Sequence, residues 1–315
     1  MKLKNKKKLT NTILFFSLFL IFFGLYVSTL EESELQEDDK GIIYTVEPDS
    51  IKVDDSSHGE NPNKSNNDKN KNNNYPDIVS EKSIILTLEQ QNDNMRKKLQ
   101  RKYGITIKYG EETANYSIAG MSTTTIKDPT TIQDILNELA IDLSQFPQGF
   151  FKEFSKKDLS LTIYLIDKYS QDNVTGVTDP RSDNVTISIA AAYPFSESFY
   201  HESFHYIERY IKLNGGTFSS WEVLNPKDFS YGTEDLSYSY ANTYSATSYF
   251  VNSYAETSAY EDRASTFEFM MAEDRTVVFQ NGTPINRKAR YIADVIDLFF
   301  TTVKSSTQEY WERYI

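Results

Sequence analysis

Three side chains within five positions, His201, Glu202 and His205, carry the clearest chemical potential in this chain. On a helix, residues four positions apart project from the same face, so both imidazoles can reach one metal ion. The glutamate after the first histidine is placed to accept a proton from a water molecule beside that ion. The third histidine of the chain, His58, lies in an asparagine-rich stretch. The spacing therefore predicts a metal site built on one helix.

Residues 201–205 (HESFH) match the H-E-x-x-H pattern that is typical of zinc peptidases. A catalytic zinc ion takes three protein ligands and leaves a fourth position for water. The metzincin subclass would place glycine and histidine where this chain has Glu208 and Ile211. The chain also has no cysteine, so an aspartate or glutamate must complete the site. We expect this third ligand on a downstream helix, within residues 254–264.

The helix that carries both histidines is predicted to begin near Pro194 and Ser196 and to end at residues 214–216, an Asn-Gly-Gly stop. The two histidines lie at the edge of its apolar stripe, which is the expected place for ligands beside a packed core. The stripe consists of Tyr200, Phe204, Ile207 and Ile211.

Other hydrophobic patterns predict the elements around this helix. The expected helices cover residues 84–103, 130–140 with Thr130 or Thr131 as the cap, 257–272 and 284–304; the expected strands cover 105–109, 159–166 and 185–189. On the helix at 257–272, a stripe that includes Tyr260 and Phe267 is expected to face the core. The order predicts an α+β, zincin-like domain with a small mixed sheet and active-site helices.

HESFH followed by the helix around YEDRASTFEF resembles the gluzincin arrangement, and more narrowly the catalytic domain of anthrax lethal factor and its relatives. In that family the third zinc ligand is a glutamate that opens a helix, with alanine three and phenylalanine six positions later. Glu261, Ala264 and Phe267 match this spacing. The resemblance implies that Glu261 completes a site for one Zn²⁺ per chain. It also implies that Tyr254, seven positions earlier, stabilises the transition state.

This resemblance covers about residues 185–271, and its EDRA stretch is also similar to membrane-anchored zinc-dependent peptidases of Gram-positive bacteria. The family often has a second glutamate directly after the alanine, where this chain has Ser265. Glu256 is the alternative third ligand. Asp262 is expected to bond a ligand histidine or Arg263, and a charge at the helix N-terminus accounts for it equally well.

The first thirty residues carry five lysines and then an apolar run at residues 13–30, near the minimum length that spans a bilayer. The lysines favour a cytoplasmic N-terminus and an extracellular body. A cleaved signal peptide, which would give a secreted protein, is the alternative. Residues 31–82 are acidic and then asparagine-rich, and predict a disordered linker. The catalytic domain is expected at residues 83–315.

The net charge of −12 includes those five N-terminal lysines, and without them residues 31–315 carry −17. Such acidity argues against a nucleic acid partner. The expected function is an extracellular, membrane-anchored zinc endopeptidase that hydrolyses peptide or protein substrates through a metal-activated water, with Glu202 as general base. The alternative is a non-catalytic surface binding module with a zincin fold, in which tyrosine-rich residues 231–254 form the contact surface.

Overall fold

The computed structural model describes residues 86–191, 194–232, 248–272, 278–303 and 307–315. Ile84–Ile315 form one compact unit. Within the described ranges no helix is both long and apolar enough to cross a membrane. The predicted span at residues 13–30 and the predicted linker at 31–82 lie outside them.

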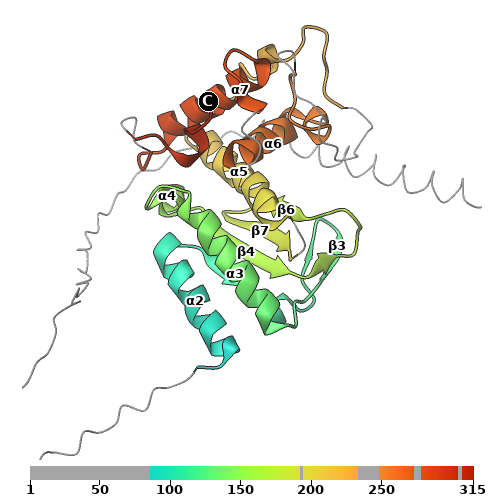
Figure 1. Ribbon diagram of the computed structural model, residues 1–315, viewed down its shortest axis with the longest axis vertical. Coiled ribbons are helices and arrows are strands. Elements are labelled where there is room, and N and C mark those ends of the chain that lie inside the picture. Colours follow the sequence, from blue (N-terminus) through green and yellow to red (C-terminus); the bar gives the residue numbers. More distant parts are fainter. Residues whose placement is uncertain (1–85, 192–193, 233–247, 273–277, 304–306) are drawn as a thin grey trace, which may run out of the picture. The chain divides into compact units, whose positions relative to one another are not determined.

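A four-stranded mixed sheet, in the order β1-β4-β7-β6, forms the centre of the unit (Figure 1). The strands β1 (Thr106–Lys108), β4 (Ser160–Ile166) and β7 (Asn184–Ala190) run parallel to one another. The fourth strand, β6 (Gly176–Asp179), pairs antiparallel with β7 and forms an edge of the sheet. The predicted strands at 159–166 and 185–189 are confirmed, and their interior is apolar because helices cover the sheet.

A second, smaller sheet was not predicted from the sequence. It joins β2 (Ser117–Ile118), β3 (Met121–Thr124) and β5 (Lys168–Tyr169) in antiparallel pairs. The Tyr169 hydroxyl donates to the Ser188 carbonyl at 2.6 Å, which fastens this sheet to β7. Strands of two to four residues carry too few alternating positions to give a pattern in the sequence.

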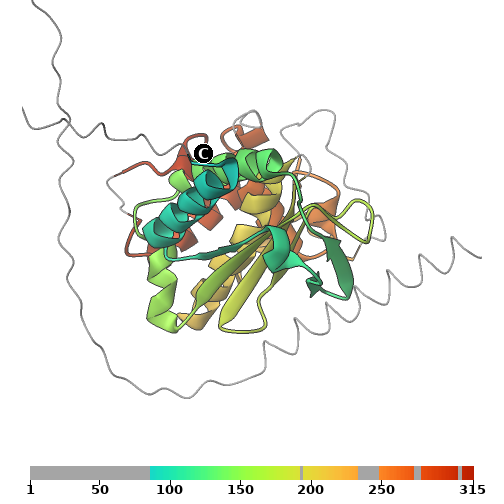
Figure 2. The ribbon, with the colours of Figure 1, turned by 90° about the horizontal axis from the view of Figure 1, so that it is seen from below.

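Two amphipathic helices, α2 (Leu88–Tyr103) and α3 (Pro129–Ser144), lie side by side against the sheet (Figure 2). Gly104 ends α2 in the left-handed conformation, as expected. The cap of α3 is Asp128, whose carboxylate accepts from the N–H groups of residues 130 and 131. The prediction of a threonine cap was wrong because the helix already begins at Pro129, and the first helical position is a usual place for proline.

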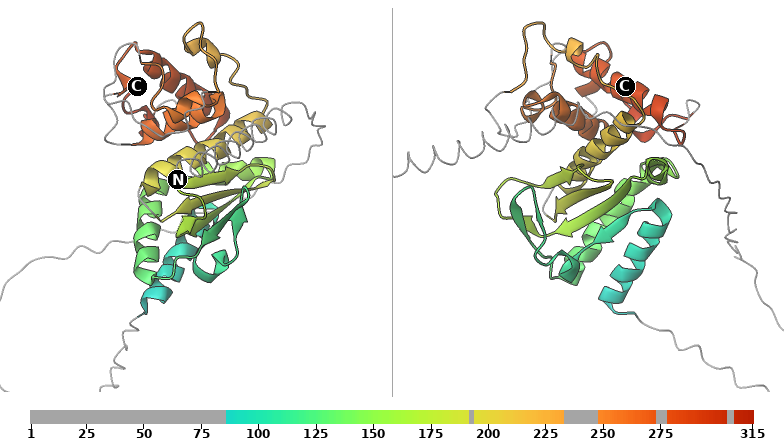
Figure 3. Two further views of the ribbon diagram at one scale, coloured as in Figure 1. Left: turned by 90° about the vertical axis from the view of Figure 1, so that its right-hand side faces the viewer. Right: turned by 180° about the vertical axis from the view of Figure 1, so that it is seen from behind.

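The remaining long helices are α5 (Phe195–Leu213), α6 (Ala259–Met271) and α7 (Pro284–Phe299). Figures 1 and 3 show α5 lying between the part that contains the sheet and the part that contains α6 and α7. The last helix ends five residues before the predicted limit, since Phe300 adopts extended backbone angles. The short helical segments are α4 (Phe150–Glu153), η1 (Gly110–Thr113), η2 (Phe154–Lys157), η3 (Glu222–Leu224), η4 (Tyr254–Glu256) and η6 (Tyr310–Glu312).

The predicted apolar stripe of α5 is confirmed, because Tyr200, Phe204, Ile207 and Ile211 are all buried. The Phe204 ring packs 5.1 Å from that of Phe267, centroid to centroid, so the stripe joins α5 to α6. Burial of one such aromatic side chain contributes about 1.5–3 kcal/mol to the free energy of unfolding. The mixed α+β class predicted from the sequence is confirmed, and its core fixes α5 and α6 against each other.

Candidate metal centre

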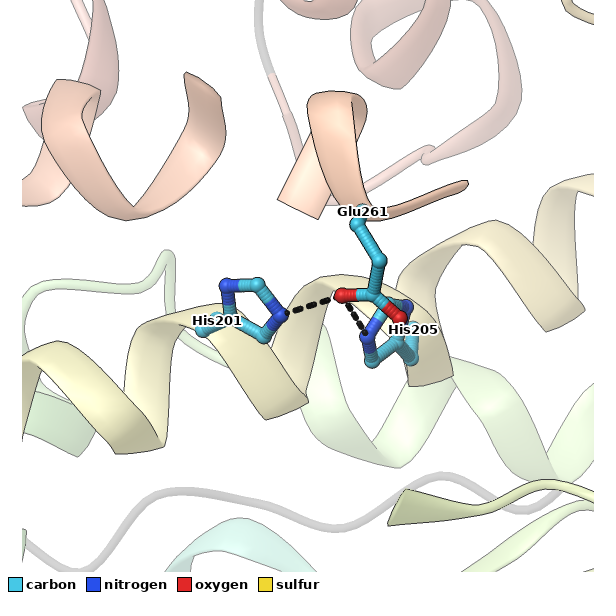
Figure 4. A group of neighbouring side chains, drawn as sticks. All are labelled: His201, His205 and Glu261. Atoms are coloured by element: carbon cyan, nitrogen blue, oxygen red, sulfur yellow. Dashed lines mark hydrogen bonds and ion pairs between the residues drawn. The ribbon is translucent and has the colours of Figure 1, made fainter. Parts of the chain in front are cut away.

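The helices α5 and α6 bring His201, His205 and Glu261 together in one group (Figure 4). Glu261 Oε2 lies 2.9 Å from His201 Nε2 and 3.6 Å from His205 Nε2. One potential ligand atom from each residue lies within 4.8 Å of the other two. All three side chains are buried, so the group belongs to the interface between the helices.

This arrangement fits a zinc ion. Zinc binds imidazole nitrogen and carboxylate oxygen at about 2.0–2.2 Å, so neighbouring ligand atoms of a tetrahedral site lie roughly 3.3–3.6 Å apart. The two measured distances, 2.9 and 3.6 Å, lie close to that range. Burial alone would raise the pKa of the Glu261 carboxyl, but the neighbouring imidazoles of His205 and His201 bring it well below its usual range. The group therefore offers an ionised carboxylate and two imidazoles, a typical zinc donor set.

Glu256, the alternative third ligand, lies on η4 and is not part of this group. Among the residues that the structure describes, Glu261 is the carboxylate that reaches both histidines. Ser258 caps α6 by accepting from the Glu261 N–H at 3.1 Å, which places Glu261 in the first turn of the helix. Glu256 precedes this cap and Glu261 follows it, so Glu261 is the one of the two that lies on α6.

His201 has a second carboxylate on its other ring nitrogen. Its Nδ1 lies 3.3 Å from Glu268 Oε2, and Glu268 is almost fully buried. Burial lowers the pKa of His201, but hydrogen bonds to Glu261 and Glu268 raise it well above its usual value. A carboxylate on the far nitrogen fixes the tautomer and orientation of a ligating imidazole. Glu268 was missed in the sequence, although it lies seven residues after Glu261 and so on the same helix face.

His205 is held differently, by an aromatic ring. The Tyr260 ring stacks on the imidazole with a centroid separation of 4.0 Å and an angle of 10°. The expectation that Tyr260 faces the hydrophobic core was wrong, since the side chain is half-buried and its ring stacks on His205. Its place one residue before Glu261 turns it toward α5 rather than toward the stripe that includes Phe267.

Glu202 lies against the edge strand β6. The Thr178 hydroxyl donates to Glu202 Oε2 at 2.6 Å. Gly176 lies so close that a Cβ there would fall 2.7 Å from Glu202 Cγ and 2.9 Å from Oε1. Burial raises the pKa of the Glu202 carboxyl, which the imidazoles partly oppose. Thr178 and Gly176 were not identified from the sequence, because neither residue type signals contact with a carboxylate.

Tyr254 also lies in this group of side chains. Its ring centroid is 5.9 Å from that of His201. The pKa of its hydroxyl is raised well above its usual value by burial, and then by the negative charges of Glu261 and Glu202. The structure therefore places Tyr254 near His201 and the two carboxylates, and its role in stabilising the transition state stays a prediction.

The predicted contact of Asp262 was wrong. Its carboxylate meets neither a ligand histidine nor Arg263 and instead accepts from Trp221, Tyr231 and Lys288. Asp262 points away from its neighbour Glu261 because successive helical residues are about 100° apart. Arg263 pairs with Glu208, the residue that stands where metzincins have glycine, at 2.6 and 2.9 Å.

Comparison with known proteins adds little to this geometry. No family model matches the sequence, and no curated protein matches it. A solved structure of a candidate zinc-binding metallo-peptidase from Bacteroides caccae ATCC 43185 is 14% identical, covering 71% of this chain and 89% of its own, with a TM-score of 0.42. At that TM-score the likeness carries no functional conclusion. What the residues themselves define is an α+β domain with a candidate His-His-Glu metal centre.

Proposed function

We propose that this chain is a zinc-dependent endopeptidase with a zincin-like catalytic domain. The observation that carries the proposal is the meeting of Glu261 with His201 and His205 across two helices. The ligand set then follows the gluzincin pattern that the sequence resembles. Glu202 lies next to these ligands in the sequence, is buried, and lies against β6.

In this proposal His201, His205 and Glu261 hold the ion. A bound zinc ion would polarise the scissile carbonyl and lower the pKa of an attacking water. Glu202 accepts the proton of that water, and it later delivers the proton to the leaving amine. The hydrogen bond from Thr178 restricts rotation of the Glu202 carboxylate during these transfers. The Tyr254 hydroxyl, which stays protonated because its pKa is raised, donates to the developing oxyanion.

The edge strand β6 supports a peptide as the substrate. β6 pairs with β7 on one side, and no strand of the described part of the chain pairs with its other side. An extended peptide can add to such an edge through main-chain hydrogen bonds. Since Gly176 and Thr178 of β6 also contact Glu202, a peptide bound there would run beside the proposed general base.

We further propose that residues 13–30 anchor the chain in the cell membrane, with the lysines in the cytoplasm and the catalytic domain outside. The linker at 31–82 would hold the catalytic domain, 83–315, away from the bilayer. This proposal rests on the apolar run and the lysines that precede it. Release after signal cleavage is the outcome that mass determination of the N-terminus would reveal.

Replacement of Glu202 by Gln tests the function. In the purified chain we expect one zinc ion per wild-type chain and cleavage of a peptide library that a chelator abolishes. Glu202→Gln should keep the zinc and lose about 10²–10⁴-fold in cleavage rate. The exposed Glu222→Gln is the matched control and should cleave at the wild-type rate.

Each departure from this outcome has a definite meaning. Absence of zinc from the wild-type chain contradicts the proposed site. Bound zinc without cleavage supports the binding module instead. A Glu202→Gln variant that cleaves as well as the wild type contradicts the role of that glutamate.

A further inference from the structure

Asp262 and Lys288 form an ion pair that is completely buried between α6 and α7. Lys288 Nζ lies 2.6 Å from Asp262 Oδ2, and both side chains have 0% exposure. Among the side-chain contacts that the structure shows for these two residues, none is to a proposed ligand. We propose that this pair positions the metal site: it fixes the rotation of α6 about its axis and so the presentation of Glu261 to α5. The inference rests on the proposed function, because it takes Glu261 as a metal ligand.

Three donors, one from α7 and two from the segment that follows α5, converge on a single oxygen atom, Asp262 Oδ2. Besides Lys288 on α7, the indole Nε1 of Trp221 donates at 2.9 Å and the hydroxyl of Tyr231 at 2.6 Å. Asn225 donates in turn to the Tyr231 hydroxyl at 2.8 Å. Hydrogen bonds to a charged acceptor are short and directional. The carboxylate therefore has a closely defined position relative to α7 and to the segment that follows α5.

Three successive residues of α6 make buried charged contacts in different directions. Glu261 points to the histidines of α5, Asp262 points to Lys288, and Arg263 forms two hydrogen bonds with Glu208 of α5. Each residue advances about 100° around the helix. A rotation of α6 that withdrew Glu261 would have to break the contacts on both sides of it. Asp262 and Arg263 thus together restrict rotation of α6 about its axis.

The same pair holds the segment that carries Tyr254. Lys288 Nζ lies 3.9 Å from the centre of the Phe250 ring, and Phe250 packs 4.6 Å from Phe229. The Gly232 N–H donates to the Glu256 carbonyl at 3.3 Å, which joins η4 to the segment at residues 218–232. A cation over aromatic faces is stabilised further when it is desolvated. The ion pair therefore lies at the point where residues 218–232 and 248–256 meet α6.

Stability alone does not account for such a pair. Removing two charges from water costs about as much as their attraction returns, and apolar replacements of similar volume are often neutral or stabilising. A purely structural pair would thus be replaceable without harm to the site. A pair that positions the site could not be replaced in this way. Apolar side chains can pack in several orientations, whereas three hydrogen bonds to one oxygen allow the carboxylate few orientations. This difference can be measured.

The test compares zinc affinity in four forms of the full chain. Asp262→Leu/Lys288→Met removes both charges together, so no buried charge is left unpaired. Tyr231→Phe is the milder variant and removes one donor. Glu153→Gln is the control. It replaces a buried carboxylate that accepts hydrogen bonds from the backbone of Thr301 and Thr302, and so weakens contacts away from the site. Zinc and Co²⁺ dissociation constants, with the Co²⁺ absorption spectrum, are measured by competition with a chelator.

We expect about tenfold weaker zinc binding and an altered Co²⁺ spectrum in the double variant, since contacts behind metal ligands commonly change affinity by about 10–100-fold. Tyr231→Phe should lose about threefold, below that range, because the other two donors to Asp262 remain. Glu153→Gln should lower the melting temperature and leave both metal readouts unchanged. Wild-type zinc affinity in the double variant would overturn the proposal while leaving the proposed function intact.

Hydrogen exchange of the metal-free forms tests the positioning role of the ion pair independently of zinc. The amides of residues 229–232, 254–256 and 259–263 should exchange faster in the double variant than in Glu153→Gln, whereas those of β4 and β7 should not. Equal exchange in the two variants overturns the positioning role. If the wild-type chain binds no zinc, the proposed function fails, and this exchange measurement alone judges the ion pair.

Discussion

The two histidines of the proposed metal centre lie one helical turn apart, yet the protein holds them by different forces. His201 lies between two buried carboxylates, with Glu261 on Nε2 and Glu268 on Nδ1. His205 meets Glu261 at the longer distance of 3.6 Å and is covered by the Tyr260 ring. The first histidine is thus oriented by charge and hydrogen bonding, and the second by the face of an aromatic ring.

The difference shows how one helix face can serve two requirements. A carboxylate behind an imidazole fixes the tautomer and increases the electron density on the ligating nitrogen. A stacked ring restricts the plane of the imidazole and leaves its protonation to other groups. Both supports come from α6, where Tyr260 and Glu268 lie on either side of Glu261 along the helix. We therefore expect that removing a charge beside His201 lowers zinc affinity more than removing the ring that stacks on His205.

The largest expected effect is on the pH dependence of the metal-free protein. The raised pKa of His201 means that its charged form stabilises the fold. This contribution to the free energy of unfolding is fully present below the unfolded pKa of about 6.5 and is lost as the pH rises through the folded pKa. Each unit of pKa difference corresponds to about 1.4 kcal/mol. We therefore expect stability in chelator to fall as the pH rises above about 6.5.

Urea denaturation between about pH 5 and pH 9 measures this dependence. Glu268→Gln should reduce the decline, because one of the carboxylates that raise the pKa of His201 is neutralised. The lowered pKa of Glu261 affects stability only at acidic pH. Its contribution to the free energy of unfolding is lost only as the pH falls below about 4.5. A metal-free wild type whose stability rises between pH 6.5 and 9 would contradict the account of His201.

The next effect is on zinc affinity at neutral pH. Glu268→Gln keeps the size of the side chain and removes the charge behind His201, so we expect about tenfold weaker zinc binding, near the lower end of the usual range. Glu256→Gln is the matched control, because Glu256 lies on η4 outside the group of proposed ligands. Isothermal titration with chelator competition measures both. Equal losses in the two variants would show that Glu268 has no special relation to the site.

These same residues show which parts of the candidate site could be predicted from the sequence. The motif at 201–205 singled out His201 and His205 because regular helical spacing places them on one face, and the family resemblance singled out Glu261, which the structure brings to them. Glu268 was missed although the same rule applied. The family pattern expects the supporting glutamate one turn after Glu261, where Ser265 stands, and here it comes one turn later.

Contacts made across elements could not be read in this way. Asp262 was assigned to the wrong partners, since nothing in the sequence indicates that Trp221, Tyr231 and Lys288 would converge on it. The closeness of Gly176 to Glu202 likewise depends on the register of β6 against β7. Predictions from periodicity therefore hold for the apolar stripe of α5, fail for Tyr260 on α6, and give no information where packing between distant segments decides.

The smallest effect is expected at His205. Tyr260→Leu removes the stacked ring but keeps an apolar side chain, and an aromatic pair is worth about 0.5–1.5 kcal/mol beyond its buried area. If part of that energy holds the imidazole in place for the metal, zinc affinity should fall by about threefold. Tyr164→Leu is the matched control, because Tyr164 stacks on Tyr116 with a centroid distance of 3.8 Å in the sheet region. It should lose comparable stability and no zinc affinity.

The comparison between the two histidines depends on the ratio of these losses. An electrostatic support retains its effect only at low ionic strength or when buried, and Glu268 is buried, so its variant should respond little to added salt. A stacking support is insensitive to salt for a different reason, because it arises from contact between ring faces. A Tyr260→Leu variant that loses more zinc affinity than Glu268→Gln would reverse the ranking and show that His205 is the more dependent ligand.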